Sequence, residues 1–370
     1  MRALAVACVV LLGVRATTVA AQDPPLRPLG AAQAVIGEYS DIAAVRELSG
    51  GRLLVLDARE QRIHLVDVAT GTTRALGRIG SGPGEYRRVN ALLAGRGDTT
   101  YAVDGGNNRL LVIAPDGTMP AVVTQWTSRP ITVSVASGAD RLGNVYGTGP
   151  LVAATPEADP TVVPDSQALV RVAVATGQGT RVATLATPPA RIRVQRSGEK
   201  IQSVEITRPP FSTGDQFAIA PGGRVSVARR GPYRVELITT AGQVTRGPIV
   251  AAPAIPVREA EREEYLATLT TAARAASASI EWPEVLPVFP LRAVLALDNG
   301  ETWVRRNVPA GTATALYDIF DARGVRTARL SMPRDRRVVA VSGTGTWVAV
   351  TDPDGLQSLE LYRAVRDLGR

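Results

Sequence analysis

A repeated unit runs through the chain, and its first clear copy reads Gly51-Arg-Leu-Leu-Val-Leu-Asp57 followed by Gln61-Arg-Ile-His-Leu-Val-Asp67. The second copy reads Thr99-Thr-Tyr-Ala-Val-Asp104 followed by Asn108-Arg-Leu-Leu-Val-Ile113, so that Asp57 and Asp104 lie 47 positions apart. Each run is short, rich in leucine and β-branched residues, and closed by turn-forming residues, as expected of β-strands. A repeat of about 40 to 50 residues built from such strands is typical of a β-propeller blade.

The same period extends to the end of the chain. Trp303 and Trp347 stand in similar runs and lie 44 positions apart. Six blades of four antiparallel strands are predicted, at residues 41–86, 87–130, 131–187, 213–250, 290–333 and 334–370. Three stretches do not fit the period and are predicted insertions, at residues 150–167, 188–212 and 251–289. The predicted fold is therefore an all-β six-bladed propeller that forms a single domain over residues 22–370.

The last predicted blade has only three strands of its own, within residues 337–363. A sheet edge left open in this way invites pairing, and a ring of blades removes such edges by closure. The run Gln33-Ala-Val-Ile-Gly37 is the expected fourth strand, because it is the β-rich segment at the other end of the domain.

One helix is predicted, over residues 256–277 between the fourth and fifth blades. Pro256 suits a first helical position, and four glutamates follow it at the positive end of the helix dipole. Leu266, Leu269, Ala273 and Ala276 form an apolar stripe. The helix is expected on the face that carries the turns between second and third strands, either as a lid or as a packed surface helix.

Residues 1–21 have the layout of a secretory signal peptide. Arg2 is followed by the apolar run from Ala3 to Val14, and Val19-Ala-Ala21 supplies the small residues of a cleavage site. The run ends at Arg15, too early for a membrane-spanning helix. We therefore expect cleavage after Ala21 and a secreted or periplasmic protein without a membrane span.

Composition excludes several kinds of site. Cys8, the single cysteine, lies in the predicted signal peptide, and His64 is the single histidine. Zinc sites, cysteine nucleophiles and serine–histidine triads all need residues that the mature chain lacks or has once. The net charge of +8 is spread along the chain without interleaved aromatics, so no nucleic-acid partner is expected.

A seven-residue loop carries a family resemblance. Gly80-Ser-Gly-Pro-Gly-Glu-Tyr86 resembles the Gly-x-Gly-Pro-Gly-Glu-aromatic loop of secreted bacterial six-bladed propellers related to NHL repeats. The resemblance implies the fold and the compartment, and no particular activity. From its residues the loop is either a rigid structural turn or an anion-binding nest of backbone N–H groups.

Arginines recur at the connection between the second and third strands of four predicted blades. The candidate ligand-binding residues are Arg62, Arg109, Arg230 and Arg306. Guanidinium groups form two-point contacts with carboxylate, sulfate or phosphate, so a ring of them would suit an anionic ligand. The leading prediction is a monomeric, non-enzymatic binding or scaffold propeller without a cofactor, with an unknown protein or glycan partner.

The alternative is a calcium-dependent hydrolase or lactonase. It is similar to the gluconolactonase-type propellers, in which carboxylates and amides line the central channel and hold calcium. Oxygen ligands for calcium are available from Asp57, Glu60, Glu85, Asp104, Asn107, Asn108 and Asp352. Asp57 and Asp104 also stand where an aspartate caps a turn, which is the competing interpretation.

Overall fold

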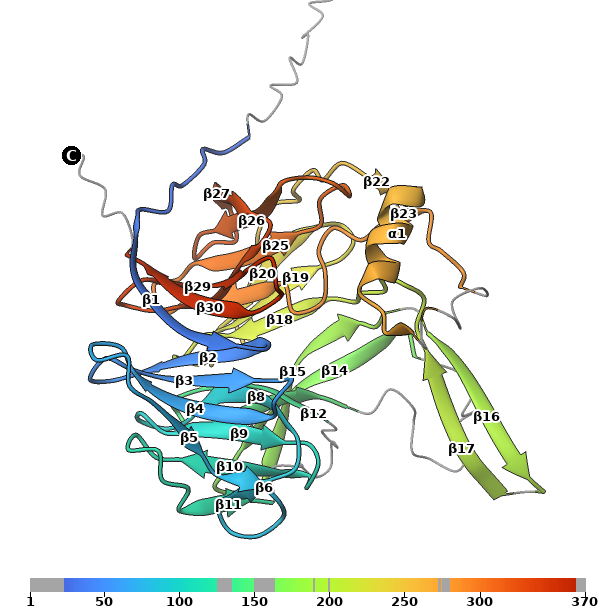
Figure 1. The fold of residues 1–370 in the computed structure, drawn as a ribbon. Helices are drawn as coiled ribbons and strands as arrows, with labels where there is room; N and C mark the ends of the chain where they lie inside the picture. Colours follow the sequence, from blue (N-terminus) through green and yellow to red (C-terminus); the bar gives the residue numbers. More distant parts are fainter. Residues whose placement is uncertain are drawn as a thin grey trace, which may run out of the picture.

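Six four-stranded antiparallel sheets form a ring of blades (Figure 1). The computed structural model describes residues 23–124, 135–149, 164–188, 190–198, 200–271, 274 and 280–363. The predicted all-β six-bladed propeller is confirmed, and the predicted ranges contain every strand of the six blades except β1 (Ala32–Tyr39), which is predicted separately as the fourth strand of the last blade. The predicted signal peptide lies outside the described residues, as does most of the insertion at 150–167.

The first three blades follow one another along the chain, with only the short strands β6 (Arg78–Ile79) and β7 (Glu85–Tyr86) between blades 1 and 2. Blade 1 consists of β2 (Ile42–Leu48), β3 (Arg52–Asp57), β4 (Arg62–Asp67) and β5 (Thr73–Leu76). Blade 2 consists of β8 (Val89–Ala94), β9 (Thr100–Asp104), β10 (Arg109–Ile113) and β11 (Ala121–Val123). Blade 3 consists of β12 (Val135–Ala139), β13 (Asn144–Thr148), β14 (Ser166–Ala173) and β15 (Gln178–Ala186).

The last three blades complete the ring. Blade 4 consists of β18 (Gln216–Ile219), β19 (Val225–Arg229), β20 (Arg234–Ile238) and β21 (Val244–Arg246). Blade 5 consists of β24 (Val294–Ala296), β25 (Thr302–Arg306), β26 (Thr314–Phe320) and β27 (Arg326–Pro333). Blade 6 consists of β28 (Arg336–Val341), β29 (Thr346–Thr351), β30 (Gln357–Tyr362) and β1 (Ala32–Tyr39).

Strand β1 closes the ring as predicted. It pairs antiparallel with β30, with Val35 opposite Glu360 and Ile36 opposite Leu359. In Figure 1 the blue β1 lies beside the red β30 of the last blade. Ile36 and Tyr39 are buried with residues of blades 1 and 6, so β1 supplies core as well as backbone pairing.

The core is divided among the contacts between neighbouring blades. Six clusters of buried apolar side chains occur among the described residues, and each joins two adjacent blades. A central strand packs on both faces, which explains why β3 reads as the continuous apolar run Leu53-Leu-Val-Leu56 instead of an alternating one. Continuous apolar strands of this kind fix the blades in their order around the ring.

Three smaller sheets stand outside the blades. The parallel pair β6 (Arg78–Ile79) and β7 (Glu85–Tyr86) flanks the glycine-rich loop. The predicted insertion 188–212 forms a hairpin of β16 (Arg191–Ser197) and β17 (Lys200–Thr207), which projects from the ring (Figure 1). The insertion 251–289 contains β22 (Ile255–Pro256), β23 (Val285–Leu286) and the helix.

The helix is shorter than predicted. Helix α1 spans Glu259–Ala267, so Pro256 belongs to β22 and does not begin the helix. Glu261 accepts a hydrogen bond from the Arg258 N–H at 3.0 Å, which fixes the start of the helix. Thr268 caps the other end of α1, and helical structure resumes at Thr271 and Arg274, where the Arg274 N–H donates to the Thr270 carbonyl oxygen at 2.8 Å. Ala273 and Ala276 of the predicted stripe lie outside the described residues. In the part of the chain described, no helix is long and apolar enough to cross a membrane.

Candidate functional site

Arg109, the first residue of β10, is held inside blade 2. Its side chain is 13% exposed, and its Nε lies 3.3 Å from Oδ2 of the buried Asp104. Its Nη atoms donate to the carbonyl oxygens of Ser81, Gly82 and Glu85, at 2.8–3.2 Å. The guanidinium group therefore ties the glycine-rich loop to the blade and is not available to a ligand.

Arg306, the last residue of β25, is also held in a buried ion pair. Its side chain is 7% exposed, and its Nη1 lies 2.8 Å from Oδ2 of the buried Asp318. The Arg306 guanidinium also stacks on the Tyr233 ring, 5.1 Å from the ring centre. The expected opening lined by four available arginines is therefore corrected, because Arg109 and Arg306 face inward to neutralise buried aspartates.

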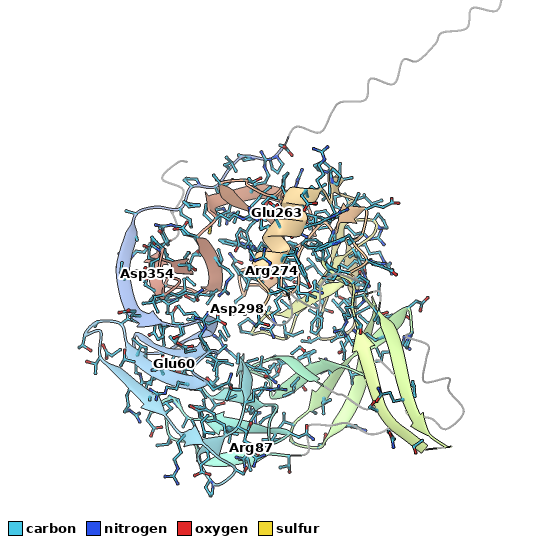
Figure 2. All side chains as sticks on the ribbon, turned by 45° about the vertical axis from the view of Figure 1, so that its right-hand side comes forward. Glu60, Arg87, Glu263, Arg274, Asp298 and Asp354 are labelled. Carbon is cyan, nitrogen blue, oxygen red and sulfur yellow. The ribbon has the colours of Figure 1, made fainter. Side chains whose placement is uncertain are left out.

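Arg62 and Arg230 remain exposed on the turn between the second and third strands of their blades. Arg62 lies 3.8 Å from Glu60 in a pair that is largely open to solvent. Arg230 donates to the Thr213 carbonyl oxygen from 3.5 Å, at the limit of a hydrogen bond. Ligand binding by these two arginines stays a prediction. Figure 2 shows Glu60 across the ring from α1, which carries Glu263. Since Arg62 lies 3.8 Å from Glu60, α1 is not a lid over Arg62.

Asp57 and Asp104 serve as turn caps. The Asp57 carboxylate accepts hydrogen bonds from the N–H groups of Ser40, Arg59 and Glu60 at 2.6–3.1 Å. Burial alone would raise the pKa of Asp104, but hydrogen bonds from Asn107 and from backbone N–H groups outweigh it, so the pKa is lowered. Among the described residues no group of three histidine, cysteine, aspartate or glutamate side chains could hold a metal ion. Use of calcium stays a prediction.

The glycine-rich loop has the contacts of a structural turn. The Gly82 N–H donates to Oε2 of Glu85 at 2.7 Å, and Arg78 pairs with Oε1 of the same carboxylate at 2.7 Å. A Cβ atom at Gly80 would collide with that carboxylate, so a larger residue there would displace the Glu85 side chain from the loop. Since Glu85 already occupies the loop, this geometry favours the turn over the anion-binding nest.

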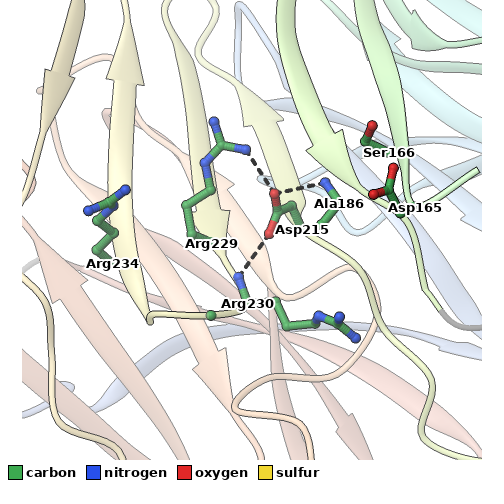
Figure 3. A pocket seen from close by; sticks show the side chains of 8 residues that line it. Asp165, Ser166, Ala186, Asp215, Arg229, Arg230 and Arg234 are labelled. Atoms are coloured by element: carbon green, nitrogen blue, oxygen red, sulfur yellow. Dashed lines mark hydrogen bonds and ion pairs between the residues drawn. The ribbon is translucent and has the colours of Figure 1, made fainter.

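Arg230 lines a pocket of about 430 Å³ between blades 3 and 4 (Figure 3). The residues of this Arg230 pocket are Asp165, Ser166, Ala186, Asp215, Arg229, Arg230, Gly231 and Arg234. The turn between β19 and β20 supplies its basic side, and the ends of β14 and β15 supply the opposite side. The pocket therefore lies at a junction of blades, next to the base of the β16–β17 hairpin.

Asp215 fixes the wall of the Arg230 pocket. Its carboxylate accepts hydrogen bonds from the N–H groups of Ala186 and Arg230, each at 2.9 Å, and pairs with Arg229 at 2.8 Å. Arg229 also pairs with the buried Glu236 at 2.7 Å. Burial alone would lower the pKa of Arg229, but these two carboxylates outweigh it and raise the pKa. Arg229 therefore stays charged, and its side chain is held in one position between blades 3 and 4.

Other polar groups of the pocket have no partner. The buried Nε of Arg234 has no hydrogen-bond acceptor, although its Nη2 lies 3.2 Å from Glu236. In the described part of the chain, the Asp165 carboxylate and the Ser166 hydroxyl have no hydrogen-bond partner either. Asp165 and Arg230 are exposed and Ser166 is partly exposed, so the pocket offers accessible acceptors and donors to a ligand.

Sequence reasoning identified only part of this pocket. The recurrence of arginine at one turn predicts Arg230. It misses Asp165 and Ser166, which lie in an insertion that no repeat aligns. No signal in the sequence places that insertion against the fourth blade, because the contact depends on the order of blades around the ring.

Comparison with known proteins gives the fold. No protein-family model and no curated protein matches the sequence. A member of the DUF4221 family from Bacteroides vulgatus is 8% identical with a TM-score of 0.54, over 92% of this chain and 99% of that one. The calcium-binding protein regucalcin from Agrobacterium tumefaciens is 12% identical with a TM-score of 0.42, over 92% and 97%. A gluconolactonase from Xanthomonas campestris is 13% identical with a TM-score of 0.45, over 92% and 95%. At such identities the likeness shows a common fold alone.

Proposed function

We propose that this protein is a non-enzymatic, exported binding propeller that takes a small hydroxylated carboxylate, such as a uronic acid, in the Arg230 pocket. The observation that carries the proposal is the set of donors and acceptors around this pocket that form no ion pair with a described residue. Arg230 and the Arg234 Nε–H need acceptors, whereas Asp165 accepts and Ser166 can do both. A carboxylate with neighbouring hydroxyl groups supplies both kinds of atom.

The arrangement of charge supports a carboxylate over a neutral sugar. Arg229 pairs with Asp215 and Glu236, and Arg234 pairs with Glu236, so Arg230 is the lining arginine that forms no ion pair with a described carboxylate. A guanidinium group offers a carboxylate two parallel N–H donors, and such charge-assisted bonds are about twice as strong as neutral ones. The fixed Arg229 wall keeps the pocket open before a ligand arrives, which lowers the entropic cost of binding.

Calorimetric titration with D-glucuronate tests the proposal. We expect glucuronate to bind and D-glucose, at the same ionic strength, to bind much more weakly. Arg230→Gln should weaken glucuronate binding by about tenfold or more, since it removes a charged hydrogen-bond partner. Raising the salt concentration should weaken the wild-type interaction, because an exposed charge pair is screened.

Arg62→Gln is the matched control. It removes an exposed arginine from the equivalent turn of blade 1, where the Arg230 pocket does not reach. This variant should bind glucuronate as the wild type does. Equal affinities of Arg230→Gln and wild type, or equal losses in both variants, would show that the pocket is not the site.

A further inference from the structure

A second pocket, of about 410 Å³, lies beside α1 and the outer strands of blade 5. Its walls are largely apolar and include Pro253, Ile255, Pro256, Val308, Pro309 and Leu316. Three of these are prolines, whose backbone has little freedom, so the walls are preformed. An apolar cavity with a few convergent polar groups is the usual form of a small-molecule site.

The polar groups of this second pocket, the Arg329 pocket, are arginines that converge on one carboxylate. The Asp23 carboxylate lies 3.2 Å from Nη2 of Arg326 and 2.9 Å from Nη1 of Arg329. Arg326 is shared with the buried Asp318 at 3.2 Å, whereas Arg329 has Asp23 as its only carboxylate among the described residues. The two guanidinium groups thus already hold a carboxylate that the chain itself supplies.

Asp23 is bound in a way that allows replacement. Its side chain is 60% exposed, whereas the Arg326 and Arg329 side chains are only 16% and 23% exposed. Solvent screens an ion pair whose carboxylate is this exposed, so the pair contributes little to stability. The segment that carries Asp23 is anchored independently, because Arg27 forms an ion pair with Glu301 at 2.7 Å and its N–H donates to the Arg329 carbonyl oxygen at 2.7 Å.

The other charged side chains that line the pocket are Glu261, whose carboxylate is held by backbone N–H groups, and the two arginines Arg258 and Arg306. Glu261 lines the pocket, but its carboxylate accepts the N–H groups of Arg258 and Ala310, at 3.0 Å each. The hydrogen bond from Ala310 is the largest cause that lowers the pKa of Glu261. Arg258 also lines the pocket and is exposed, and its side chain forms no ion pair with a described residue.

We propose that the Arg329 pocket binds a small carboxylate with an apolar body, and that Asp23 is an internal carboxylate which such a ligand displaces. The apolar part would lie against the proline-rich walls, and its carboxylate would take the place of Asp23 between Arg326 and Arg329. This inference concerns a different pocket and does not depend on the function proposed above.

The test is calorimetric titration with phenylacetate and with its uncharged analogue phenylacetamide, at constant ionic strength. We expect phenylacetate to bind and phenylacetamide to bind at least about tenfold more weakly. Asp23→Asn keeps the shape of the side chain and removes the competing charge, so it should tighten phenylacetate binding roughly two- to fivefold. Arg329→Gln should weaken it by about tenfold.

Two controls separate the possible outcomes. Leu316→Trp fills the pocket and should abolish phenylacetate binding, with a thermal melt to confirm that the variant folds. Glucuronate binding should be unchanged in Asp23→Asn and Arg329→Gln, because neither residue lines the Arg230 pocket. The inference is overturned if phenylacetate does not bind, if phenylacetamide binds equally well, or if Asp23→Asn and Arg329→Gln both leave its affinity unchanged.

Discussion

Asp318 is the residue on which the polar core of blade 5 depends. It is fully buried and contacts three side chains, those of Arg306 at 2.8 Å, Arg326 at 3.2 Å and Tyr233 at 2.9 Å. Tyr233 belongs to blade 4, so this carboxylate also joins two blades. A buried charge pair of this kind is costly to break because the remaining partner is left without compensation.

Asp318→Asn should therefore lower the free energy of unfolding by about 3 to 5 kcal/mol. Asn keeps the size of the side chain and removes the charge that neutralises Arg306. Urea unfolding followed by circular dichroism measures the change. Asp354→Asn, on an exposed turn of blade 6, is the matched control and should change stability by no more than about 0.5 kcal/mol. Similar effects of the two substitutions would contradict the role assigned to Asp318.

His64 gives a second test at the residue scale. It packs edge-on against Tyr39 of β1, with ring centres 5.6 Å apart. Burial is the main cause that lowers its pKa below 6.5, and Arg62 also lowers it, whereas Asp57 and Glu60 raise it. Since the folded pKa is depressed, the neutral ring's contribution to stability is complete above about pH 6.5 and is lost as the pH falls through the folded pKa.

The chain has a single histidine, so one imidazole signal in a proton NMR titration reports this group. We expect the midpoint of this titration below pH 6.5. We also expect the melting temperature, taken relative to its value at pH 7.5, to fall further at pH values below that midpoint in the wild type than in His64→Gln. A midpoint above 6.5 would show that the Asp57 and Glu60 charges dominate over burial.

At the scale of elements, β1 is the strand that turns five complete blades and one incomplete blade into a ring. Ile36 of β1 is 4% exposed, whereas its neighbour Val35 is 67% exposed. The two residues share one strand and one partner strand, β30, and differ in the face they occupy. They therefore separate the contribution of packing from that of backbone pairing.

Ile36→Ala should cost about 2 to 5 kcal/mol, since it leaves a cavity between blades 1 and 6. Val35→Ala should cost about 0.5 kcal/mol or less. Deletion of residues 33–37 should destabilise the whole ring, because it leaves the edge of β30 unpaired. The measurement is the midpoint of urea unfolding. Equal effects of the two alanine substitutions, or an unchanged midpoint in the deletion, would show that β1 does not close the ring.

Secondary-structure elements that belong to the repeated blade unit could be predicted from the sequence, whereas elements in the insertions between blades could not. The strands follow an alternating or continuous apolar pattern that depends on local sequence, and β1 followed from the missing fourth strand. The helix was predicted too long, because a proline and a run of glutamates are compatible with a start at several positions. The hairpin β16–β17 was expected only as an insertion, since nothing in its sequence repeats.

The directions in which the arginine side chains point could not be predicted from the sequence either. Recurrence at one turn placed Arg62, Arg109, Arg230 and Arg306 at comparable positions, but it could not show which guanidinium groups point inward. That depends on buried partners such as Asp104 and Asp318, which are distant in the sequence or lie on the far side of a turn. Arg326 and Arg329 of the second pocket were not predicted, because their partner Asp23 is about 300 residues away.

For the whole molecule, stability without metal is the expectation that separates a binding propeller from a calcium enzyme. The carboxylates of Asp57 and Asp104 are occupied by backbone N–H groups, so they have no need of a cation. The melting temperature should be the same with calcium and with a chelator. A fall of several degrees on chelation would indicate a bound cation that stabilises the folded state.

The most direct measurement is a crystal structure of the protein soaked with D-glucuronate. The predicted result is electron density for the sugar between blades 3 and 4, with its carboxylate within hydrogen-bond distance of the Arg230 guanidinium and a hydroxyl group beside Asp165. Glucuronate found elsewhere on the propeller, or an empty Arg230 pocket at concentrations that saturate binding in solution, would contradict the proposed function.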